Sequence, residues 1–364
     1  MRREITTALA ACAAACAATP EAPAPPLTAP SLAAPIVIAH RGASGERPEH
    51  TLAAYRLAIA QGADWIEPDL VMTRDGVLVA RHENEISETT DVAARPEFAA
   101  RRRSQTIDGE AVTGWFTEDF TLAELKTLRA KERLPQLRPA NTAFDGQEAI
   151  PSFAEVLALA QEAGVGVYPE TKHPSHFAAL GLDMNTALLQ DLAAAGLGEA
   201  QGRVFIQSFE VGNLERLAKA TRLPLVQLVA ARGGPPDRPG LSYAEMLSDA
   251  GLQAIARYAQ GLGPEKALIL PRDGAGRSLA PSDLIARAHA AGLQVHPWTF
   301  RLENVFLPAE LRRGDPAAAN FAALPGDLDA EMAQMLALGV DGLFTDFPAR
   351  GVAARERAKA EAAN

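Results

Sequence analysis

From residue 35 onward, short apolar runs alternate with longer segments whose apolar positions repeat at helical spacing. The first run, Pro35 to Ala39, is rich in β-branched residues and leads through a glycine-rich turn into a helical pattern from Thr51 to Gln61. Such short runs predict buried strands. Further strands are predicted at Trp65 to Val71, Val165 to Tyr168, Val204 to Gln207, Leu225 to Val229, Leu268 to Leu270, Leu293 to Trp298 and Gly342 to Thr345. Between most of them helices are predicted at Ser152 to Ala163, Asn185 to Ala195, Leu214 to Ala220, Ser282 to Ala291 and Asp329 to Leu338.

This alternation predicts an α/β fold with parallel strands and helical crossovers. Roughly eight strands favour a closed (β/α)8 TIM barrel over an open doubly wound sheet. No Gly-x-Gly-x-x-Gly pattern opens the first helix, which counts against a dinucleotide site. We therefore expect one barrel domain over residues 35–364.

Two segments fit the alternation poorly. Residues 83–149 are long and polar, and residues 301–325 interrupt the last two repeats with proline, glycine and asparagine. Both are predicted to be insertions in loops that follow strands, where substrate-shaping elements of such barrels lie.

The first 34 residues are predicted to be separate from the barrel. They begin with two arginines, continue through an alanine-rich stretch and become rich in proline and alanine, which is typical of an export signal and tether. Cys12 and Cys16 each follow small residues, as in a bacterial lipoprotein signal. An ordinary signal cleaved near Ala17 to Thr19, or a disordered leader, is the alternative. We expect an exported protein, periplasmic or lipid-anchored at a bacterial cell envelope, that meets the membrane only through this anchor.

The amino-acid composition limits the partners and reactions that are expected of this chain. The 364 residues are 48% hydrophobic and carry a formal net charge of -10, which counts against nucleic acid as a partner. The only two cysteines lie in the leader, so the predicted barrel has no thiol for a disulfide, a thiolate metal site or a cysteine nucleophile.

Polar residues gather where the predicted strands end. These residues are His40, Arg41, Glu67, Asp69, His82, Glu170 and Lys172. Each alone could be a cap or a salt-bridged residue, but functional groups of a barrel sit at the C-terminal ends of its strands. Like charges brought together there repel unless something neutralises them.

Three of these residues are candidate metal ligands. Glu67 and Asp69 are two positions apart, so on a strand both side chains point the same way. With Glu170 they offer hard oxygen donors and no sulfur, which suits one Ca²⁺ or Mg²⁺ ion better than zinc. Metal-independent acid and base chemistry by two carboxylates, as in glycosidases, is the alternative.

The remaining four residues suit phosphate chemistry. His40 and His82 can act as proton carriers because imidazole titrates near neutrality. Arg41 offers a planar fork that matches phosphate, and Lys172 adds a point charge. A metal with these cations describes a site that stabilises charge developing on a phosphate.

Longer motifs resemble one known family. The stretch from His40 to Val92, which begins HRGASGERPEHT and contains IEPDLVMTRDGVLVARHENE, resembles the glycerophosphodiester phosphodiesterases, in particular their long, exported bacterial type. Further matching pieces are YPETKHP from Tyr168, QSFE from Gln207, HPWTFRLEN from His296 and FTDFP from Phe344. The resemblance spans about residues 36–350.

The resemblance implies a TIM barrel that hydrolyses glycerophosphodiesters to sn-glycerol 3-phosphate and an alcohol with Ca²⁺ or Mg²⁺. It places the metal on Glu67, Asp69 and Glu170, and the acid and base on His40 and His82. It places phosphate on Arg41, with Lys172 close by. Phe209 and Trp298 would line the rim near the glycerol or alcohol, although core packing is the alternative for an isolated aromatic residue.

Several points stay open at this stage. A phospholipase D-like enzyme for lysophospholipids or sphingolipids, and a barrel that binds phosphodiesters without cleaving them, are rival functions. Neither the nucleophile, water or the substrate's own hydroxyl, nor the acid and base assignment follows from the sequence. The preferred head group and the oligomeric state are equally undetermined. His50 is expected to have a structural role at the start of the first helix, and no role is assigned to His173 or His176.

Overall fold

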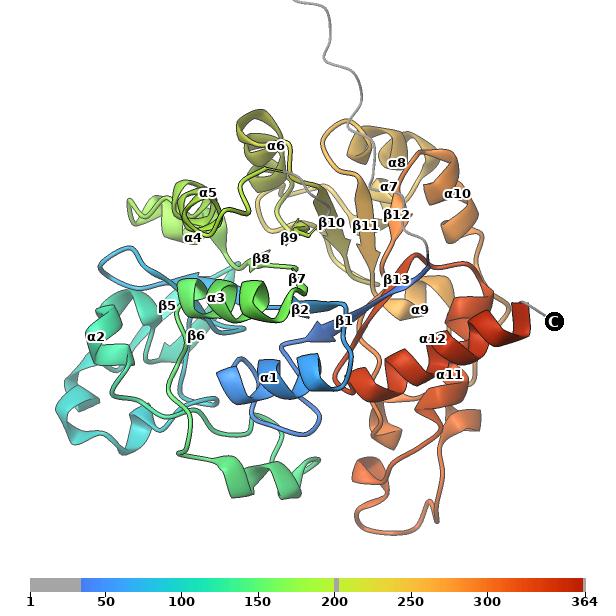
Figure 1. The fold of residues 1–364 in the computed structure, drawn as a ribbon, viewed down its shortest axis with the longest axis horizontal. Helices are drawn as coiled ribbons and strands as arrows, with labels where there is room; N and C mark the ends of the chain where they lie inside the picture. Colours follow the sequence, from blue (N-terminus) through green and yellow to red (C-terminus); the bar gives the residue numbers. More distant parts are fainter. Residues whose placement is uncertain (1–33, 200–202, 363–364) are drawn as a thin grey trace, which may run out of the picture.

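The computed structural model describes residues 34–199 and 203–362. Its centre is a ring of parallel strands (Figure 1). The strands are β1 (Ile36–His40), β2 (Trp65–Glu67), β3 (Asp69–Met72), β7 (Gly166–Val167), β8 (Glu170–Thr171), β9 (Ile206–Ser208), β10 (Leu225–Val229), β11 (Gly261–Pro264), β12 (Gln294–Val295) and β13 (Gly342–Thr345). Because β2 and β3 are separated only by Pro68, and β7 and β8 by two residues, they occupy eight positions around the ring.

Backbone pairing runs around this ring. The order β13-β1-β2-β7 forms one ladder and β12-β11-β10-β9-β8-β3 the other, and both contain only parallel pairs. The gap between β12 and β13 is bridged where Phe300 pairs with Thr345 and where Asp341 N donates to Val295 O at 3.0 Å. The predicted TIM barrel is confirmed.

Helices cover the outside of the strands (Figure 1). The longer ones are α1 (Leu52–Ala60), α3 (Phe153–Ala163), α5 (Met184–Ala194), α6 (Val211–Ala220), α8 (Asp249–Ile255), α10 (Leu284–Ala290), α11 (Leu328–Ala337) and α12 (Pro348–Ala362). Three shorter helices are α4 (Pro174–Ala179), α7 (Tyr243–Met246) and α9 (Lys266–Ile269). Local sequence sets these bounds. For example, Ser152 and Glu155 form a capping box at the start of α3, and Gly164 at φ 73° ends it.

One predicted strand is wrong. Leu268 to Leu270 was expected to be a strand, but these residues belong to α9 and its C-terminal cap, and the strand of this repeat is β11. The sequence of β11, GLGP, has little strand propensity. A Cβ at Gly263 would lie 2.6 Å from Leu228 Cδ2, and one at Gly261 3.0 Å from Val226 Cγ2. Packing against the neighbouring strand therefore requires glycine at these two positions. Because glycine is not hydrophobic, the strand could not be predicted from a run of hydrophobic residues.

The two segments predicted as insertions contain short elements. Residues 83–149 contain an antiparallel hairpin of β5 (Arg103–Ile107) and β6 (Glu110–Gly114), together with α2 (Leu122–Leu125). They also contain 3-10 helices η1 (Val92–Ala94), η2 (Pro96–Arg101), η3 (Thr117–Asp119) and η4 (Pro139–Phe144). Residues 301–325 contain η5 (Asn304–Phe306), η6 (Ala309–Leu311) and η7 (Phe321–Ala323). The strand β4 (Leu78–Ala80), which precedes the first segment, pairs antiparallel with β3. Figure 1 shows the hairpin and α2 to one side of the strands.

Aromatic residues fill part of the barrel interior. Tyr168 stacks on Phe205 with ring centroids 5.0 Å apart, and Trp65 and Phe344 pack against the same pair. His296 is fully buried and lies 2.8 Å from the Tyr168 hydroxyl through its Nδ1. This cluster is a packed core rather than a pore.

The predicted leader of residues 1–34 lies almost wholly outside the described residues, so the structure does not test it. Among the helices that the structure describes, none is both long and apolar enough to span a membrane.

Candidate active site and metal centre

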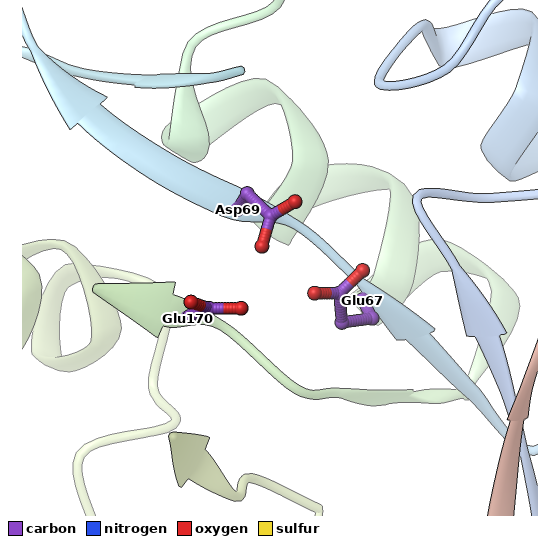
Figure 2. A group of neighbouring side chains, drawn as sticks. All are labelled: Glu67, Asp69 and Glu170. Carbon is purple, nitrogen blue, oxygen red and sulfur yellow. The ribbon is translucent and has the colours of Figure 1, made fainter. Parts of the chain in front are cut away.

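The three candidate metal ligands come together on neighbouring strands, beside the short breaks between β2 and β3 and between β7 and β8. Glu67 ends β2, Asp69 begins β3, and Glu170 begins β8, where it is paired in register with Asp69. One carboxylate oxygen from each lies within 4.8 Å of the others. Figure 2 shows the three side chains directed toward one space. Within the described residues, no other group of three acidic, histidine or cysteine side chains is arranged in this way.

Burial makes this triad costly without a cation. Glu67 and Asp69 are each 1% exposed and Glu170 is 6% exposed. Burial and the neighbouring carboxylates raise the pKa of Glu67 well above its usual range. Burial also raises the pKa of Glu170 to about 8, against the opposing effect of Lys172. Burial would raise the pKa of Asp69 too, but Lys172 and Arg41 hold it well below the usual value.

The donor set fits a hard divalent cation. All three side chains are carboxylates, and Asp69 Oδ1 accepts no hydrogen bond from the part of the chain that the structure describes. Lys172 Nζ lies 3.6 Å from this oxygen. A metal ion bound here would satisfy this oxygen and relieve the repulsion within the triad.

Other donors hold the carboxylates in place. The Arg41 backbone N–H donates to Glu67 Oε2 at 2.8 Å, and Gln207 Nε2 donates to Glu67 Oε1 at 3.1 Å. Lys172 Nζ lies 2.8 Å from Glu170 Oε1. These contacts leave the Glu67 side chain little freedom to rotate away from the metal position.

His50 does more than stabilise the start of α1. It is fully buried, and its Nε2 lies 2.9 Å from Asp69 Oδ2 while its Nδ1 lies 2.8 Å from the Tyr55 hydroxyl. The expected structural role is therefore combined with a contact that orients a candidate metal ligand.

His40, at the end of β1, is held by an acidic partner. Its Nδ1 lies 2.6 Å from Asp346 Oδ1, and Asp346 also contacts Arg138 and Arg301. Burial and the neighbouring Arg41 lower the pKa of His40 to about 3. The imidazole is therefore neutral near neutral pH, and with Nδ1 engaged its Nε2 is left for chemistry.

His82 follows β4, and a carboxylate lies within ion-pair distance of its ring. Its Nδ1 lies 2.5 Å from Glu83 Oε1. Burial, Arg41 and Lys172 together lower the pKa of His82 to about 3. Each candidate proton carrier thus has one ring nitrogen against a carboxylate.

Arg41 sits among carboxylates. Its Nη1 lies 3.0 Å from Glu49 Oε2 and its Nε lies 3.1 Å from Asp69 Oδ2. Its backbone has φ 60°, an uncommon conformation for a non-glycine residue, and the same residue's N–H binds Glu67. Burial opposes the charge, but the carboxylates outweigh it and raise the pKa of Arg41.

A cavity of about 350 Å³ opens over these groups. Eight of the nine candidate residues line it, and Asp69 is not among its lining residues. The Phe209 and Trp298 rings lie edge to face with centroids 5.9 Å apart, and Lys172 Nζ lies 5.9 Å from the Phe209 centroid. Both aromatic residues therefore combine packing with exposure to the cavity.

Comparison with known proteins identifies the family. The model of the glycerophosphoryl diester phosphodiesterase family matches residues 40–350. The chain belongs to this family. It is similar to the glycerophosphodiester phosphodiesterase GDPD6 of Arabidopsis thaliana, with 39% identity over 86% of this chain and 84% of the relative. It is 30% identical to a glycerophosphodiester phosphodiesterase of Haemophilus influenzae, over 87% of this chain and 88% of that protein.

Solved structures agree on the fold. A phosphodiesterase of Oleispira antarctica, in complex with the product sn-glycerol-3-phosphate, has a TM-score of 0.59 at 22% identity and covers 89% of this chain and 97% of that one. A glycerophosphodiester phosphodiesterase of Agrobacterium tumefaciens has a TM-score of 0.55 at 19% identity over 87% and 99% of the two chains. The predicted family, barrel fold and enzyme class, a phosphodiester hydrolase, are confirmed. The roles of individual residues remain predictions.

Some residues of this phosphodiesterase site were given no role from the sequence. Gln207 and Asp346 lie within the motifs QSFE and FTDFP, so the signal for them was present without a function attached. Arg138 carries no motif and reaches Asp346 from the first insertion. Only the three-dimensional structure shows such a partner, because 208 positions separate the two residues.

Proposed function

We propose that this site hydrolyses glycerophosphodiesters to sn-glycerol 3-phosphate and an alcohol. The observation that carries the proposal is a cavity lined by two imidazoles, by Arg41 and Lys172 and by two carboxylates of the buried triad. Each imidazole lies beside a further carboxylate. A cavity of about 350 Å³ suits a small-molecule ester. The product bound by the Oleispira antarctica phosphodiesterase supports the same substrate class.

Arg41 and Lys172 hold the phosphate in this mechanism. Both are buried cations whose side chains line the cavity beside the triad. Their charges favour binding of an anionic diester despite the net negative charge of the chain, and they stabilise the negative charge that develops on the phosphoryl oxygens. The binding is local, so it needs no extended basic surface.

The two histidines transfer protons. One takes the proton of the attacking oxygen, and the other gives a proton to the oxygen that leaves with the alcohol. Asp346 engages Nδ1 of His40 in a hydrogen bond, and Glu83 lies beside Nδ1 of His82, so Nε2 of each imidazole is the nitrogen assigned to the substrate. The negative charge of a bound diester would raise the pKa of an adjacent imidazole, and it thereby favours the protonated form that the acid requires.

Glu67, Asp69 and Glu170 would hold one divalent cation, Ca²⁺ or Mg²⁺. When bound, this ion would supply Lewis-acid stabilisation of charge on a phosphoryl oxygen. The attacking oxygen is water or the free hydroxyl at C2 of the substrate's glycerol. The second route passes through a cyclic glycerophosphate, so detection or absence of that species by phosphorus NMR during turnover distinguishes them.

The residue roles are tested with single variants. We expect His40→Ala and His82→Ala each to lower turnover of glycerophosphocholine by at least about 100-fold, the lower end of what general acid and base catalysis contributes. The measurement is release of sn-glycerol 3-phosphate by purified protein at saturating metal. His289→Ala, in which an exposed histidine at the end of α10 is removed, is the matched control and should turn over normally. Full metal-dependent turnover in either site variant would refute the paired roles.

We also propose that the chain is exported and is either periplasmic or lipid-anchored at the cell envelope. The support is the amino-terminal pattern of two arginines, an alanine-rich stretch and the cysteines Cys12 and Cys16. Fractionation of cells that express the full chain tests this proposal, with Cys12→Ser and Cys16→Ser compared singly and together. Release of the protein from the membrane fraction by one substitution identifies the anchored residue. A protein that stays in the cytoplasm in all forms would contradict export.

A further inference from the structure

Two histidines without an assigned role connect the first insertion to the active site. His173 and His176 follow β8, the strand that carries Glu170, and each contacts an acidic residue of the insertion. His173 Nδ1 lies 2.7 Å from Asp108 Oδ2, and His176 Nε2 lies 2.9 Å from Glu118 Oε1. The hairpin of β5 and β6, whose turn contains Asp108, is therefore held against the loop that follows β8.

The contact at His173 continues to a candidate catalytic residue. His173 Nε2 lies 3.4 Å from Glu83 Oε2, and the other oxygen of Glu83 lies 2.5 Å from His82 Nδ1. Asp108, His173, Glu83 and His82 thus form an unbroken series of side chains, which we name the Asp108–His82 series. All four line the cavity.

Backbone conformation at two members of this series is unusual. Asp108 and His173 both have φ 48°, in the left-handed region that non-glycine residues rarely adopt. Aspartate and histidine adopt this conformation more often than most other non-glycine residues. Such conformations persist where surrounding contacts enforce them, and they cluster at functional sites.

The first three members of the series carry alternating charges. Burial would lower the pKa of His173, but Asp108 and Glu83 outweigh it and raise this pKa to about 9. His173 is therefore a cation near neutral pH, between two carboxylates. Glu83 is half exposed at the cavity, with 48% of its side chain accessible. A carboxylate this accessible would otherwise be mobile, so the His173 cation supplies a contact that keeps its second oxygen directed at His82.

We propose that Asp108 and His173 are positioning residues that act through Glu83 on His82, so that the first insertion completes the active site. The negative charge of a carboxylate close to Nδ1 favours the ring form with its proton on Nδ1, which leaves Nε2 free to exchange a proton with the substrate. The loss of such an outer partner lowers activity even though it touches no substrate. This inference rests on the proposed function of His82 as a proton carrier.

The test compares Asp108→Asn, His173→Asn and Glu83→Gln with the wild-type chain. Asparagine tolerates φ above zero, so both asparagine variants keep the backbone conformation while they remove the charge. We expect each variant to lower kcat for glycerophosphocholine by about tenfold or more, with little change in KM. Asp119→Asn is the matched control, because Asp119 pairs with Arg103 elsewhere in the same insertion. It should keep the wild-type kcat.

A double variant distinguishes a positioning role from a general loss of local structure. If both residues act through one contact, Glu83→Gln combined with His173→Asn is no slower than the slower single variant. Losses that multiply, single variants with wild-type kcat, or an equal loss in Asp119→Asn would each overturn the proposal. Asp108 is exposed, so its variant provides a result even where His173→Asn does not fold.

Nitrogen NMR of the His82 ring tests the Asp108–His82 series independently of catalytic activity. We expect a neutral ring with its proton on Nδ1 in the wild-type chain, and a mixture of the two neutral forms in His173→Asn. Identical spectra in the two proteins would overturn the positioning role. A wild-type chain that shows the expected His82 form without hydrolysing the diester would instead refute the proposed function and leave the positioning contact supported.

Discussion

At the scale of single residues, burial decides which groups are charged. Glu67 and Glu170 have raised pKa values because they are buried beside other carboxylates, whereas Asp69 is held ionised by Lys172 and Arg41. His40 and His82 are held neutral by burial and by nearby cations. These pKa shifts agree with the proposed divalent cation and with the proposal that the imidazoles gain a proton when an anionic substrate binds.

The carboxylate triad gives a prediction for metal binding. A cation that binds only the folded chain stabilises it by about 2.7 kcal/mol at a concentration of 100 times the Kd. We expect Ca²⁺ or Mg²⁺ to raise the Tm of the wild-type chain, and Glu67→Gln to abolish most of this rise. Calorimetry with and without EDTA measures it, with Glu356→Gln, an exposed position on α12, as the control. An equal rise in Glu67→Gln would contradict the assigned site.

His296 gives a prediction for pH. Burial lowers its pKa from 6.5 to about 4, so between these values the unfolded chain binds a proton that the folded chain does not. Stability must then fall as the pH falls through this window, by up to about 3 kcal/mol from this residue. We expect His296→Gln, which keeps a partner for Tyr168, to flatten the dependence of the unfolding free energy between pH 6.5 and 4. Urea titrations at several pH values measure this, and an unchanged slope would refute it.

At the scale of elements, the site is assembled from strand ends and braced by the two insertions. Arg138 of the first insertion binds Glu303 of the second through Nε at 2.6 Å and Asp346 after β13 through Nη2 at 2.5 Å. A further hydrogen bond joins its Nη1 to Ser44 O at 2.8 Å. One buried guanidinium thus connects both insertions to the carboxylate that holds His40.

Arg138→Met tests this brace. The substitution leaves Glu303 and Asp346 buried with fewer partners, and we expect a loss of about 3 to 5 kcal/mol in unfolding free energy. Turnover should fall as well, because Asp346 is then less firmly held against His40. Arg95→Met is the matched control, since Arg95 pairs with Asp91 near the surface and its loss should cost far less stability. Equal losses in the two variants would contradict a special role for Arg138.

Strands and helices could be predicted from the sequence where runs of hydrophobic side chains indicate burial. The β-branched strands were located well, and Leu225 to Val229 coincides with β10. The strand β11 was missed because Gly261 and Gly263 are chosen by their neighbours Val226 and Leu228 rather than by strand propensity. A hydrophobic pattern does not detect a strand in which glycines take the place of hydrophobic side chains.

The same contrast applies to the site. Glu67, Asp69 and Glu170 were recognisable because strand ends converge in a barrel, so local position implied spatial proximity. Asp346, Arg138 and Asp108 reach the site across hundreds of positions or from the tip of an insertion hairpin. Sequence periodicity does not indicate such long-range contacts. They were identified only from the three-dimensional structure.

At the scale of the whole molecule, the acidic charge belongs to the barrel. Residues 1–34 contain two basic and two acidic side chains, so the net charge of -10 remains without them. An anionic substrate must therefore be attracted by the cations inside the cavity rather than by a basic surface.

Truncation tests the independence of the barrel. All nine candidate site residues lie between positions 40 and 298, so we expect a chain that begins at residue 34 to keep the kcat and KM of the full chain. Steady-state assays of the two proteins in the same buffer and metal concentration provide the measurement. A large loss of kcat in the shorter chain would show that the amino-terminal segment contributes to the site.

The most direct test of the central claim is phosphorus NMR of the products. Purified protein is incubated with glycerophosphocholine, glycerophosphoethanolamine or lysophosphatidylcholine, each with Ca²⁺, Mg²⁺ or EDTA. We expect sn-glycerol 3-phosphate from the glycerophosphodiesters with metal and none with EDTA. Cleavage of the lysolipid alone would favour the phospholipase D-like function, and product formation that is insensitive to EDTA would contradict metal-dependent hydrolysis.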